Sequence, residues 1–387
     1  MGVPVLDLTR QYSTIREDVE KALREVFETQ HFILGKQGQS LEKEVAAHLG
    51  AAHAVGCASG TDALLLGLRA LGLKRGEGVL TTSFTFFATA GAIHNAGGRP
   101  FFADIDPSTY NLDPADVARF LDEECAPGGE GLPVHKVTGC TIRVLLPVHL
   151  YGLCADMDAL NEIAKKHHLM VLEDSCQAYG ASYKGRRAGV LGHLSAFSFF
   201  PTKNLGGAGD GGILTTDDGA LADHLRMLRV HGSRERYVHE EIGYNSRLDE
   251  VQAAVIRVKV PRVDGWNRQR DEVAGGYRKG LAGVHQVVVP AVPEGYTHIY
   301  HQYVIRAERR DDLKAFLQER GVGSMIYYPI PLHEQTCFRF LGYRTGDLPH
   351  TEKAAREVLA LPVFAELTAA EVAEVCTGIA AFYRGSR

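Results

Sequence analysis

One lysine in this sequence stands in a glycine-rich segment where it could do chemistry. The stretch FFPTKNLGGAGDGG runs over residues 199–212, and Lys203 precedes a formal G-x-G-x-x-G match at residues 207–212. A dinucleotide-binding fingerprint needs a helix that opens at the third glycine. Here the short, β-branched stretch GGILTTDD follows, so the glycines are predicted to lie between two strands. This context argues against a nicotinamide-dependent oxidoreductase.

The alternative chemistry belongs to Lys203 itself. A lysine on a rigid turn beside a sheet can form a Schiff base with an aldehyde cofactor. The glycines around it would let the backbone and a cofactor approach each other without a Cβ clash. Taken alone, a lysine in a loop is best explained as a solvated surface charge, so the interpretation depends on the other motifs.

Two further segments carry groups that would suit the same cofactor. In SGTDALLLGL, Gly60 and Thr61 open a predicted helix directly after a strand, which creates an anion site for a phosphate ester. In VLEDSCQAYGA, Asp174 ends a buried strand, where a carboxylate could pair with a protonated pyridine nitrogen. Gln177 could then bond the neighbouring ring oxygen. The alternative for both segments is ordinary helix capping.

Two more residues are candidates with simpler alternatives. Phe86, in SFTFFATA, could lie flat on an aromatic ring, or it could pack in the core. Asn245, in GYNSRLDEVQAA, could contact a ligand, or it could cap the helix that follows.

The elements that must hold these residues alternate between strand and helix. Short apolar runs such as AAHAVGCAS, IRVLLPV and MVLEDS each precede or follow a helical pattern, which predicts an α/β fold with a doubly wound, mostly parallel sheet. Amphipathic helices are predicted over residues 15–29 and 41–49 before the first strand. Residues 122–141 interrupt the alternation and are expected to form an irregular surface loop.

The character of the chain changes near residue 257. A helix is predicted to reach about Val260, where Pro261 breaks or kinks it, and a second helical stretch extends to about Gly280. HQYVIRA, DDLKAFLQERG and GSMIYYP then predict strand, helix and strand, and a capping box at Thr368–Glu371 opens the last helix. We therefore expect a large domain over residues 1–257 and a smaller α+β domain over residues 258–387.

Composition excludes several classes of function. The 387 residues carry a formal net charge of −5, which is atypical of a nucleic-acid-binding protein. The seven cysteines form no C-x-x-C pair and favour reduced thiols in the cytosol. The first residues are not typical of a signal peptide, and no apolar run reaches the ~20 residues needed to span a membrane. A cytoplasmic protein without a membrane segment is expected.

Taken together, these motifs resemble the DegT/DnrJ/StrS-type sugar aminotransferases, which are pyridoxal-phosphate (PLP) enzymes of the aspartate-aminotransferase-like fold, fold type I. The resemblance extends over nearly the whole chain, from PVLDLTRQY and HFILGKQGQSLEKEVA to IYHQYVIRA, IYYPIPLH and LPVF. It implies the following roles: Lys203 as the lysine that binds the cofactor covalently, Asp174 as the partner of the pyridinium, Gln177 as the ligand of the 3′-oxygen, Phe86 as the stacking ring, Gly60, Thr61 and Ser198 as phosphate ligands, and Asn245 as a phosphate ligand supplied by the neighbouring subunit.

The resemblance also implies an activity. Because Lys203 is retained where some members carry a histidine and run a dehydration, it implies transamination, from L-glutamate to a nucleotide-linked keto-hexose, in a homodimer with shared sites. The block around Lys203 is similar to members that act on 3-keto sugars, and a 4-keto sugar is the alternative. Tyr327, Tyr328 and His333 would line the sugar pocket, or pack in the core; no metal site is expected. A catalytically silent PLP-fold sensor remains the alternative from another class.

Overall fold

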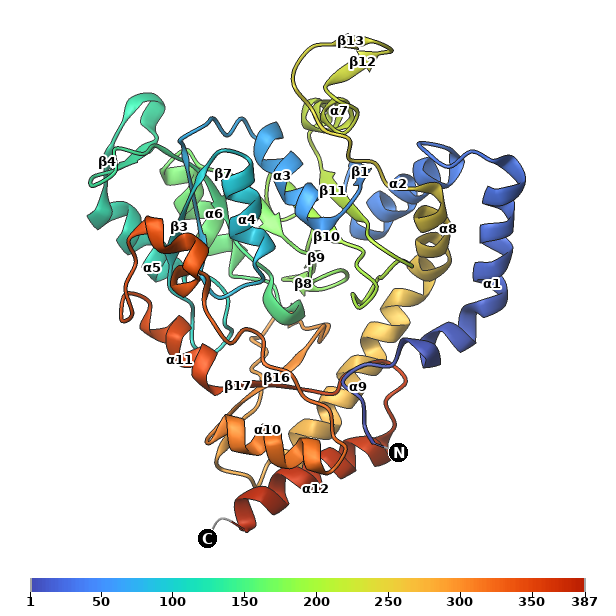
Figure 1. The fold of residues 1–387 in the computed structure, drawn as a ribbon. Helices are drawn as coiled ribbons and strands as arrows, with labels where there is room; N and C mark the ends of the chain where they lie inside the picture. The colour runs from blue at the N-terminus through green and yellow to red at the C-terminus, as the bar shows by residue number, and fades with distance from the viewer. Residues whose placement is uncertain (1, 386–387) are drawn as a thin grey trace.

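The computed structural model describes residues 2–385, and a seven-stranded sheet forms the centre of its larger part (Figure 1). The strand order is β1-β11-β10-β7-β6-β2-β3. The strands are β1 (His53–Cys57), β2 (Gly78–Thr82), β3 (Arg99–Ala103), β6 (Ile142–Leu146), β7 (Met170–Asp174), β10 (Leu194–Ser198) and β11 (Gly212–Thr216). Neighbours from β10 to β3 are parallel, whereas β11 runs antiparallel to both β1 and β10. The predicted mostly parallel sheet is confirmed.

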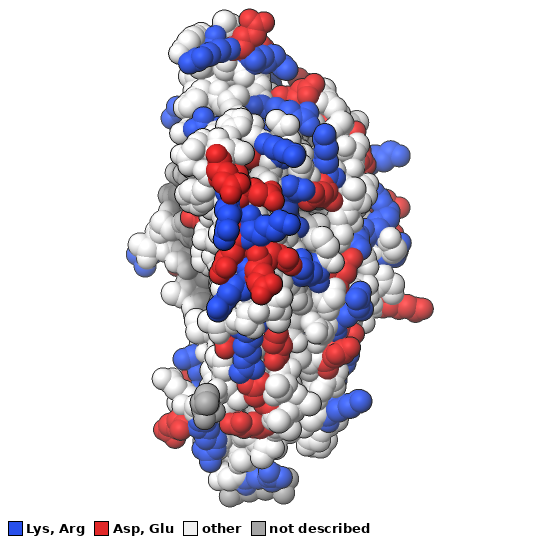
Figure 2. All heavy atoms as spheres, turned by 90° about the vertical axis from the view of Figure 1, so that its right-hand side faces the viewer, with Lys and Arg blue, Asp and Glu red and all other residues white. Residues whose placement is uncertain are grey.

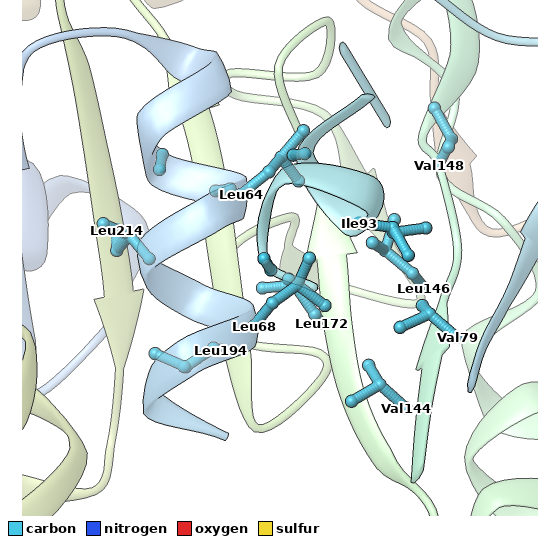
Figure 3. Packing of buried hydrophobic residues seen from close by; sticks show 14 of the residues in the cluster. Leu64, Leu68, Val79, Ile93, Val144, Leu146, Val148, Leu172, Leu194 and Leu214 are labelled. Atoms are coloured by element: carbon cyan, nitrogen blue, oxygen red, sulfur yellow. The ribbon is translucent and has the colours of Figure 1, made fainter. Parts of the chain in front are cut away.

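Both faces of this sheet are buried by helices. On one face, Leu64 and Leu68 of α3 (Gly60–Ala70) lie over the sheet near Leu172 and Leu214, as Figure 3 shows. The same cluster includes residues of α4 (Ala88–Asn95) and α7 (Gly219–Leu228). Strand residues alternate between the faces, so Val171 packs in a second cluster on the other side with α6 (Met157–Lys166) and α5 (Pro114–Arg119). This double burial explains the continuous apolar runs of the strands.

Three helices, α1 (Leu8–Thr29), α2 (Lys36–Leu49) and α8 (Glu250–Lys259), form a further layer beside β1, β10 and β11. Helix α1 begins seven residues before the predicted start at Ile15, because Asp7 caps it and its first two turns are polar. Helix α2 begins at Lys36 instead of the predicted Leu41. Its first amides donate to the buried carboxylate of Glu250, a cap more than 200 residues away in sequence that no local pattern reveals.

The C-terminal part is built on the antiparallel sheet β14-β16-β17, formed by residues Val287–Val288, Tyr303–Ala307 and Val358–Leu361. Its helices are α9 (Val263–Leu281), α10 (Arg310–Glu319), α11 (Pro349–Glu357) and α12 (Ala369–Arg384). Pro261 lies in a 3₁₀ turn between α8 and α9, as predicted, and the capping box of α12 is present. The predicted strand in GSMIYYP does not form. Met325 makes only an isolated bridge to Ala360, so the segment is free to turn toward the larger part.

Short elements complete the described chain. The segment over residues 122–141 is more regular than predicted, since the hairpin of β4 (Cys125–Pro127) and β5 (Pro133–His135) follows a π-helical turn at Phe120–Glu124. A second hairpin, β12 (Ser233–Glu235) with β13 (Val238–His239), projects from the body (Figure 1). The remaining strands β8 (Ser182–Tyr183), β9 (Arg186–Arg187) and β15 (Tyr296–Thr297) form a small sheet.

The face that carries α1 and α8 shows positive and negative side chains interleaved rather than a field of one sign (Figure 2). Ion pairs such as Arg257 with Glu44, at 2.6 Å, join neighbouring helices there. Among residues 2–385, no helix combines the length and the apolar character that crossing a bilayer requires.

The first residue of β11 tests the packing between this strand and α3. A Cβ on Gly212 would lie 2.3 Å from the carbonyl oxygen of Ser59, which is backbone and cannot move aside cheaply. Gly212→Ala should therefore lower the free energy of unfolding in urea by about 1–3 kcal/mol. Gly219→Ala, where the nearest atom is 3.5 Å away, is the matched control and should change stability by less than about 1 kcal/mol. Equal stability of the two variants would contradict the close approach.

Candidate functional site

Lys203 lies on the turn that joins β10 to β11, between two strands as the sequence predicted. The turn is closed by hydrogen bonds from the Lys203 amide to the Phe200 oxygen (2.9 Å) and from the Gly207 amide to the Phe199 oxygen (2.7 Å). Its glycines are required by close packing, since a Cβ on Gly206 would lie 2.4 Å from the oxygen of Pro201. The backbone that presents Lys203 is therefore a closely packed, hydrogen-bonded turn.

The side chain of Lys203 is partly buried, and within residues 2–385 its amine has no hydrogen bond or ion pair. Burial lowers its pKa, and the nearby Cys176 thiol and Asp174 carboxylate oppose that shift only in part. A lowered pKa increases the fraction of neutral amine, which is the nucleophilic and basic form. This is an unusual environment for a lysine that merely carries a surface charge.

Asp174 ends β7 and is buried. One carboxylate oxygen accepts a hydrogen bond from the hydroxyl of Thr89 at 2.8 Å, and the other accepts one from the amide of Cys176 at 3.2 Å. These bonds orient the carboxylate and leave further lone pairs available. The helix-cap alternative is not supported, because no helix begins directly after Asp174.

The turn before α3 forms a cradle for an anion. Ser59 is the N-cap and accepts from the amide of Asp62 at 3.0 Å, so the cap predicted as the alternative is real. The amides of Gly60 and Thr61 have no partner in the described chain, and they lie at the positive end of the helix. A Cβ on Gly60 would lie 2.6 Å from the Cβ of Ser198, which shows that the end of β10 packs directly against this turn.

Gln177 connects two parts of the site. Its oxygen accepts from the amide of Tyr151 at 2.8 Å, and its amide nitrogen donates to the hydroxyl of Tyr328 at 2.9 Å. The ring of Tyr328 lies 6.2 Å from that of Phe86, between centroids, at a tilt of 44°. Phe86 is 55% exposed, so core packing does not account for it. Gln177, Tyr328 and Phe86 thus lie together although the sequence separates them widely.

Tyr327 and His333, the other two candidates for the sugar pocket, differ in how deeply their side chains are buried. Tyr327 is partly buried, and its main-chain oxygen accepts a hydrogen bond from the hydroxyl of Tyr151. The ring of His333 is fully buried; its Nδ1 lies 2.7 Å from Oγ of Ser83, and Nε2 lies 3.4 Å from a carboxylate oxygen of Glu352. These contacts agree with the core-packing alternative for His333.

Asn245 is exposed, and its side chain has no hydrogen bond to any other residue in the range 2–385. The alternative that it caps the following helix is wrong, because α8 begins at Glu250 and its N-cap is Asp249. The neighbouring residue, Ser246, bonds the α3 segment through the carboxylate of Asp62 at 2.6 Å. Asn245 therefore has an exposed side-chain amide that is free to bind a ligand.

The structure adds residues that the sequence did not single out, namely Thr89, Tyr151, Cys176, Asn204 and His301. Thr89 bonds Asp174 across 85 positions of sequence, and Tyr151 bonds Gln177 across 26. Most of them lie inside the quoted motifs, but the spacing of those motifs does not show which residues contact one another. Only the folded sheet brings them together.

These groups suit a phosphorylated pyridine aldehyde. The fit rests on an unpaired amine of lowered pKa, a buried carboxylate held by two donors, and unpaired amides at the start of α3. An aldehyde, a ring nitrogen and a phosphate are the partners that such groups prefer.

Comparison with known proteins gives the same result. A model of the DegT/DnrJ/EryC1/StrS aminotransferase family matches residues 13–380. The chain is 47% identical over 386 residues to the "Pleiotropic regulatory protein" of Geobacillus stearothermophilus, covering 99% of each chain. It is 42% identical over 378 residues to a UDP-N-acetyl-3-dehydro-alpha-D-glucosamine 3-aminotransferase of Acidithiobacillus ferrooxidans. The alignment covers 98% of this chain and 97% of that protein. It is 41% identical over 361 residues to a dTDP-3-amino-3,4,6-trideoxy-alpha-D-glucose transaminase of Streptomyces venezuelae. The alignment covers 93% of this chain and 91% of that protein.

Solved structures are similar over the whole chain. S. venezuelae DesV in complex with a ketimine intermediate superposes with a TM-score of 0.92 at 39% identity, covering 98% of both chains. NtdA of Bacillus subtilis with bound cofactor PMP superposes with a TM-score of 0.88 at 31% identity, covering 99% of this chain and 85% of that one. These matches confirm the predicted fold type I, the aminotransferase class and the PLP cofactor. Since the family model matches the chain from within α1 to within α12, this protein belongs to the DegT/DnrJ/EryC1/StrS aminotransferase family.

Proposed function

We propose that this aminotransferase moves the amino group of L-glutamate to a nucleotide-linked 3-keto-hexose. The product would be an amino sugar for a surface polysaccharide or a secondary metabolite, made in the cytosol. The observation that carries the proposal is the amine of Lys203, which is partly buried, has no ion pair within residues 2–385 and lies close enough to Asp174 for that carboxylate to affect its pKa. The names of two relatives, a UDP-sugar 3-aminotransferase and a dTDP-3-amino-sugar transaminase, support the 3-keto assignment.

The proposed binding residues fall into three groups. Gly60, Thr61 and Ser198 would hold the phosphate, Asp174 the ring nitrogen, and Gln177 the ring oxygen, with Phe86 against the ring face. When bound, PLP supplies an electron sink for the electron pair that remains on the substrate carbon after it loses a proton. The hydrogen bond from Thr89 fixes the direction of the Asp174 carboxylate, which keeps its negative charge aimed at one point.

Lys203 acts as the base and then as the acid. Its neutral amine takes the proton from the substrate carbon and later returns it to the other side of the transferred nitrogen. Because burial lowers its pKa, a larger fraction of the amine is neutral and available as a base at any given pH. The rigid turn limits the volume that the amine can explore, which favours proton transfer over a fixed short path.

The sugar pocket is proposed to include Tyr327 and Tyr328. The side-chain amide of Gln177 donates a hydrogen bond to the hydroxyl of Tyr328. If Gln177 binds the cofactor and Tyr328 binds the sugar, this hydrogen bond links the two binding sites. The buried ring of His333 supports a role in holding this segment against Ser83 rather than contact with the sugar.

A regulatory role without catalysis is the second candidate, because the relative from Geobacillus stearothermophilus is named a regulatory protein. Such a protein would not need an unpaired lysine of lowered pKa beside Asp174. A substrate panel separates the two candidates directly.

The lowered pKa of Lys203 can be measured against a lysine with the opposite shift. Lys184 is exposed and its pKa is raised, chiefly by a hydrogen bond to Asp158. In protein freed of cofactor, the pH profile of acetylation read by peptide mass spectrometry should give a lower midpoint for Lys203 than for Lys184, since only the neutral amine reacts. A midpoint for Lys203 at or above that of Lys184 would contradict the desolvated site.

The substrate is tested with UDP- and dTDP-linked 3-keto and 4-keto sugars, L-glutamate and PLP. We expect amination of a 3-keto sugar with kcat/KM at least about tenfold above that for any 4-keto sugar. Lys203→Ala should reduce the rate by at least about 10²-fold, because the base is lost. Preference for a 4-keto sugar would refute the regiochemistry. Absence of amination, with no change of the absorbance of bound PLP on adding glutamate, would favour the regulatory candidate.

The homodimer with shared sites is tested by mixing two inactive chains. If Asn245 reaches the cofactor phosphate of the neighbouring subunit, a heterodimer of Lys203→Ala with Asn245→Ala has one site that lacks both residues and one that is intact. Random mixing of equal amounts should then restore up to roughly a quarter of wild-type activity, since half of the dimers are mixed and half of their sites work.

This experiment requires that Asn245→Ala by itself be nearly inactive and that subunit exchange be demonstrated. A mixture that stays inactive under those conditions would show that Asn245 acts within its own chain. Ser246→Ala serves as the control variant. It removes the bond to Asp62 within one chain, so mixing it with Lys203→Ala should not produce the same pattern of rescue.

A further inference from the structure

Thr85 lies in the segment that leads into α4, four residues before Thr89. Both threonines are buried, since Thr85 is 3% exposed and Thr89 is 0% exposed. Their hydroxyl oxygens lie 3.0 Å apart, and the hydroxyl of Thr89 lies 2.8 Å from a carboxylate oxygen of Asp174. The three side chains therefore form a continuous line of hydrogen-bonding groups from the start of α4 to the end of β7.

The directions of these two hydrogen bonds follow from the number of protons available. An ionised carboxylate can only accept, so the single hydroxyl proton of Thr89 is donated to Asp174. The contact between the two threonines must then use the proton of Thr85, which donates to the oxygen of Thr89. Among residues 2–385, the hydroxyl of Thr85 makes no other hydrogen bond.

The bond from Thr85 constrains where the hydroxyl of Thr89 can point. A threonine in a helix can also donate to a main-chain carbonyl three or four residues earlier, which would take the proton away from Asp174. When Thr85 occupies a lone pair of the Thr89 oxygen, fewer directions remain for the Thr89 proton. Linked hydrogen bonds also polarise one another, which strengthens the bond that reaches the carboxylate.

We propose that Thr85 is a positioning residue for Asp174 and acts through Thr89. The inference rests on the proposed function, in which Asp174 binds the ring nitrogen of the cofactor, and deepens it. Thr89 donates to one carboxylate oxygen, and the amide of Cys176 donates to the other at 3.2 Å. The carboxylate is thus held in one orientation before the cofactor binds, so binding requires less reorganisation.

The same hydrogen bonds hold the segment that carries Phe86. Phe86 follows Thr85 directly in the chain, but it is 55% exposed, and its ring lies 6.2 Å from the ring of Tyr328 between centroids. One short segment therefore bears the proposed stacking ring and, through Thr85 and Thr89, the groups that orient Asp174. A planar cofactor would contact the stacking ring and the carboxylate together, so both gain from a segment fixed to the end of β7.

A double-mutant cycle tests whether Thr85 acts through Thr89. Valine has nearly the shape of threonine without the hydroxyl, so Thr85→Val and Thr89→Val each remove a link of the chain. The probe is pyridoxamine 5′-phosphate, which Lys203 does not bind covalently, and its Kd for protein freed of cofactor is measured by calorimetry. Thr89→Val should raise this Kd at least about tenfold, the size expected for a hydrogen bond to a charged group, and Thr85→Val about 2- to 10-fold. The double variant should bind like Thr89→Val within about twofold, because Thr85 then has no hydroxyl to position.

Two further variants separate this role from a contribution to folding alone. Thr85→Ser keeps the hydroxyl and should restore the wild-type Kd within about twofold. Thr81→Val is the matched control, because the hydroxyl of Thr81 is also buried but donates to the main-chain oxygen of Leu146 at 2.6 Å. This control should lower the stability of the protein in urea and leave the Kd for pyridoxamine 5′-phosphate unchanged.

A wild-type Kd in Thr85→Val would overturn the proposal. Additive losses in the double variant would overturn it as well, since they would show that Thr85 acts independently of Thr89. If Thr85→Val does not fold, Thr85→Ala takes its place in the cycle and is judged by the same criteria. These titrations use no sugar, so they stand even if the proposed substrate is wrong, whereas wild-type protein that binds no pyridoxamine 5′-phosphate would refute the proposed function together with this inference.

Discussion

The parallel pairing of β7 with β10 is the constraint on which the site depends. In this register Asp174 lies opposite Ala196, so the strand that ends in the carboxylate runs beside the strand that leads to Lys203. The reversed strand β11 then returns the chain along β10, which makes the Lys203 segment a closed turn instead of a crossover to a helix. A carboxylate and an amine that are separated in sequence thereby share one edge of the sheet.

The residue before Asp174 shows how firmly this edge is held. Glu173 is fully buried on the opposite face, and its carboxylate accepts from the amides of Gly189, Leu191 and Gly192 and from the ring of His149 at 2.9 Å. A buried carboxylate needs such compensation. The main-chain amide of His149 also donates a hydrogen bond to the main-chain oxygen of Asp174, so this network holds the backbone at the strand end. Thr89 orients the side chain of Asp174.

The site contains two kinds of group, which differ in their hydrogen bonding. Asp174 and Gln177 have several hydrogen-bond partners each and are held in one orientation. The side chains of Lys203 and Asn245 and the first amides of α3 lack partners in the part of the chain that is described. The fully bonded groups provide a rigid frame, and the unbonded groups are those with capacity left for a ligand. Such preorganisation lowers the reorganisation needed during catalysis.

The sequence alone determined the class of this protein. Alternation of apolar strands with amphipathic helices predicted the sheet, because periodicity depends on local burial, and GGILTT after the glycines excluded a nucleotide loop. The motifs around Lys203, Asp174 and Gly60 predicted the family. Helix starts were less accurate, since the cap of α2 comes from Glu250, and the strand expected at Met325 did not form. What only the tertiary structure decided is which groups meet: Thr89 with Asp174, Tyr328 with Gln177, and His301 with Asn204. Hydrogen bonds between distant segments leave no periodic pattern in a sequence. Each of them depends on how the strands are paired and how the helices pack, and the spacing of residues along the chain does not show this.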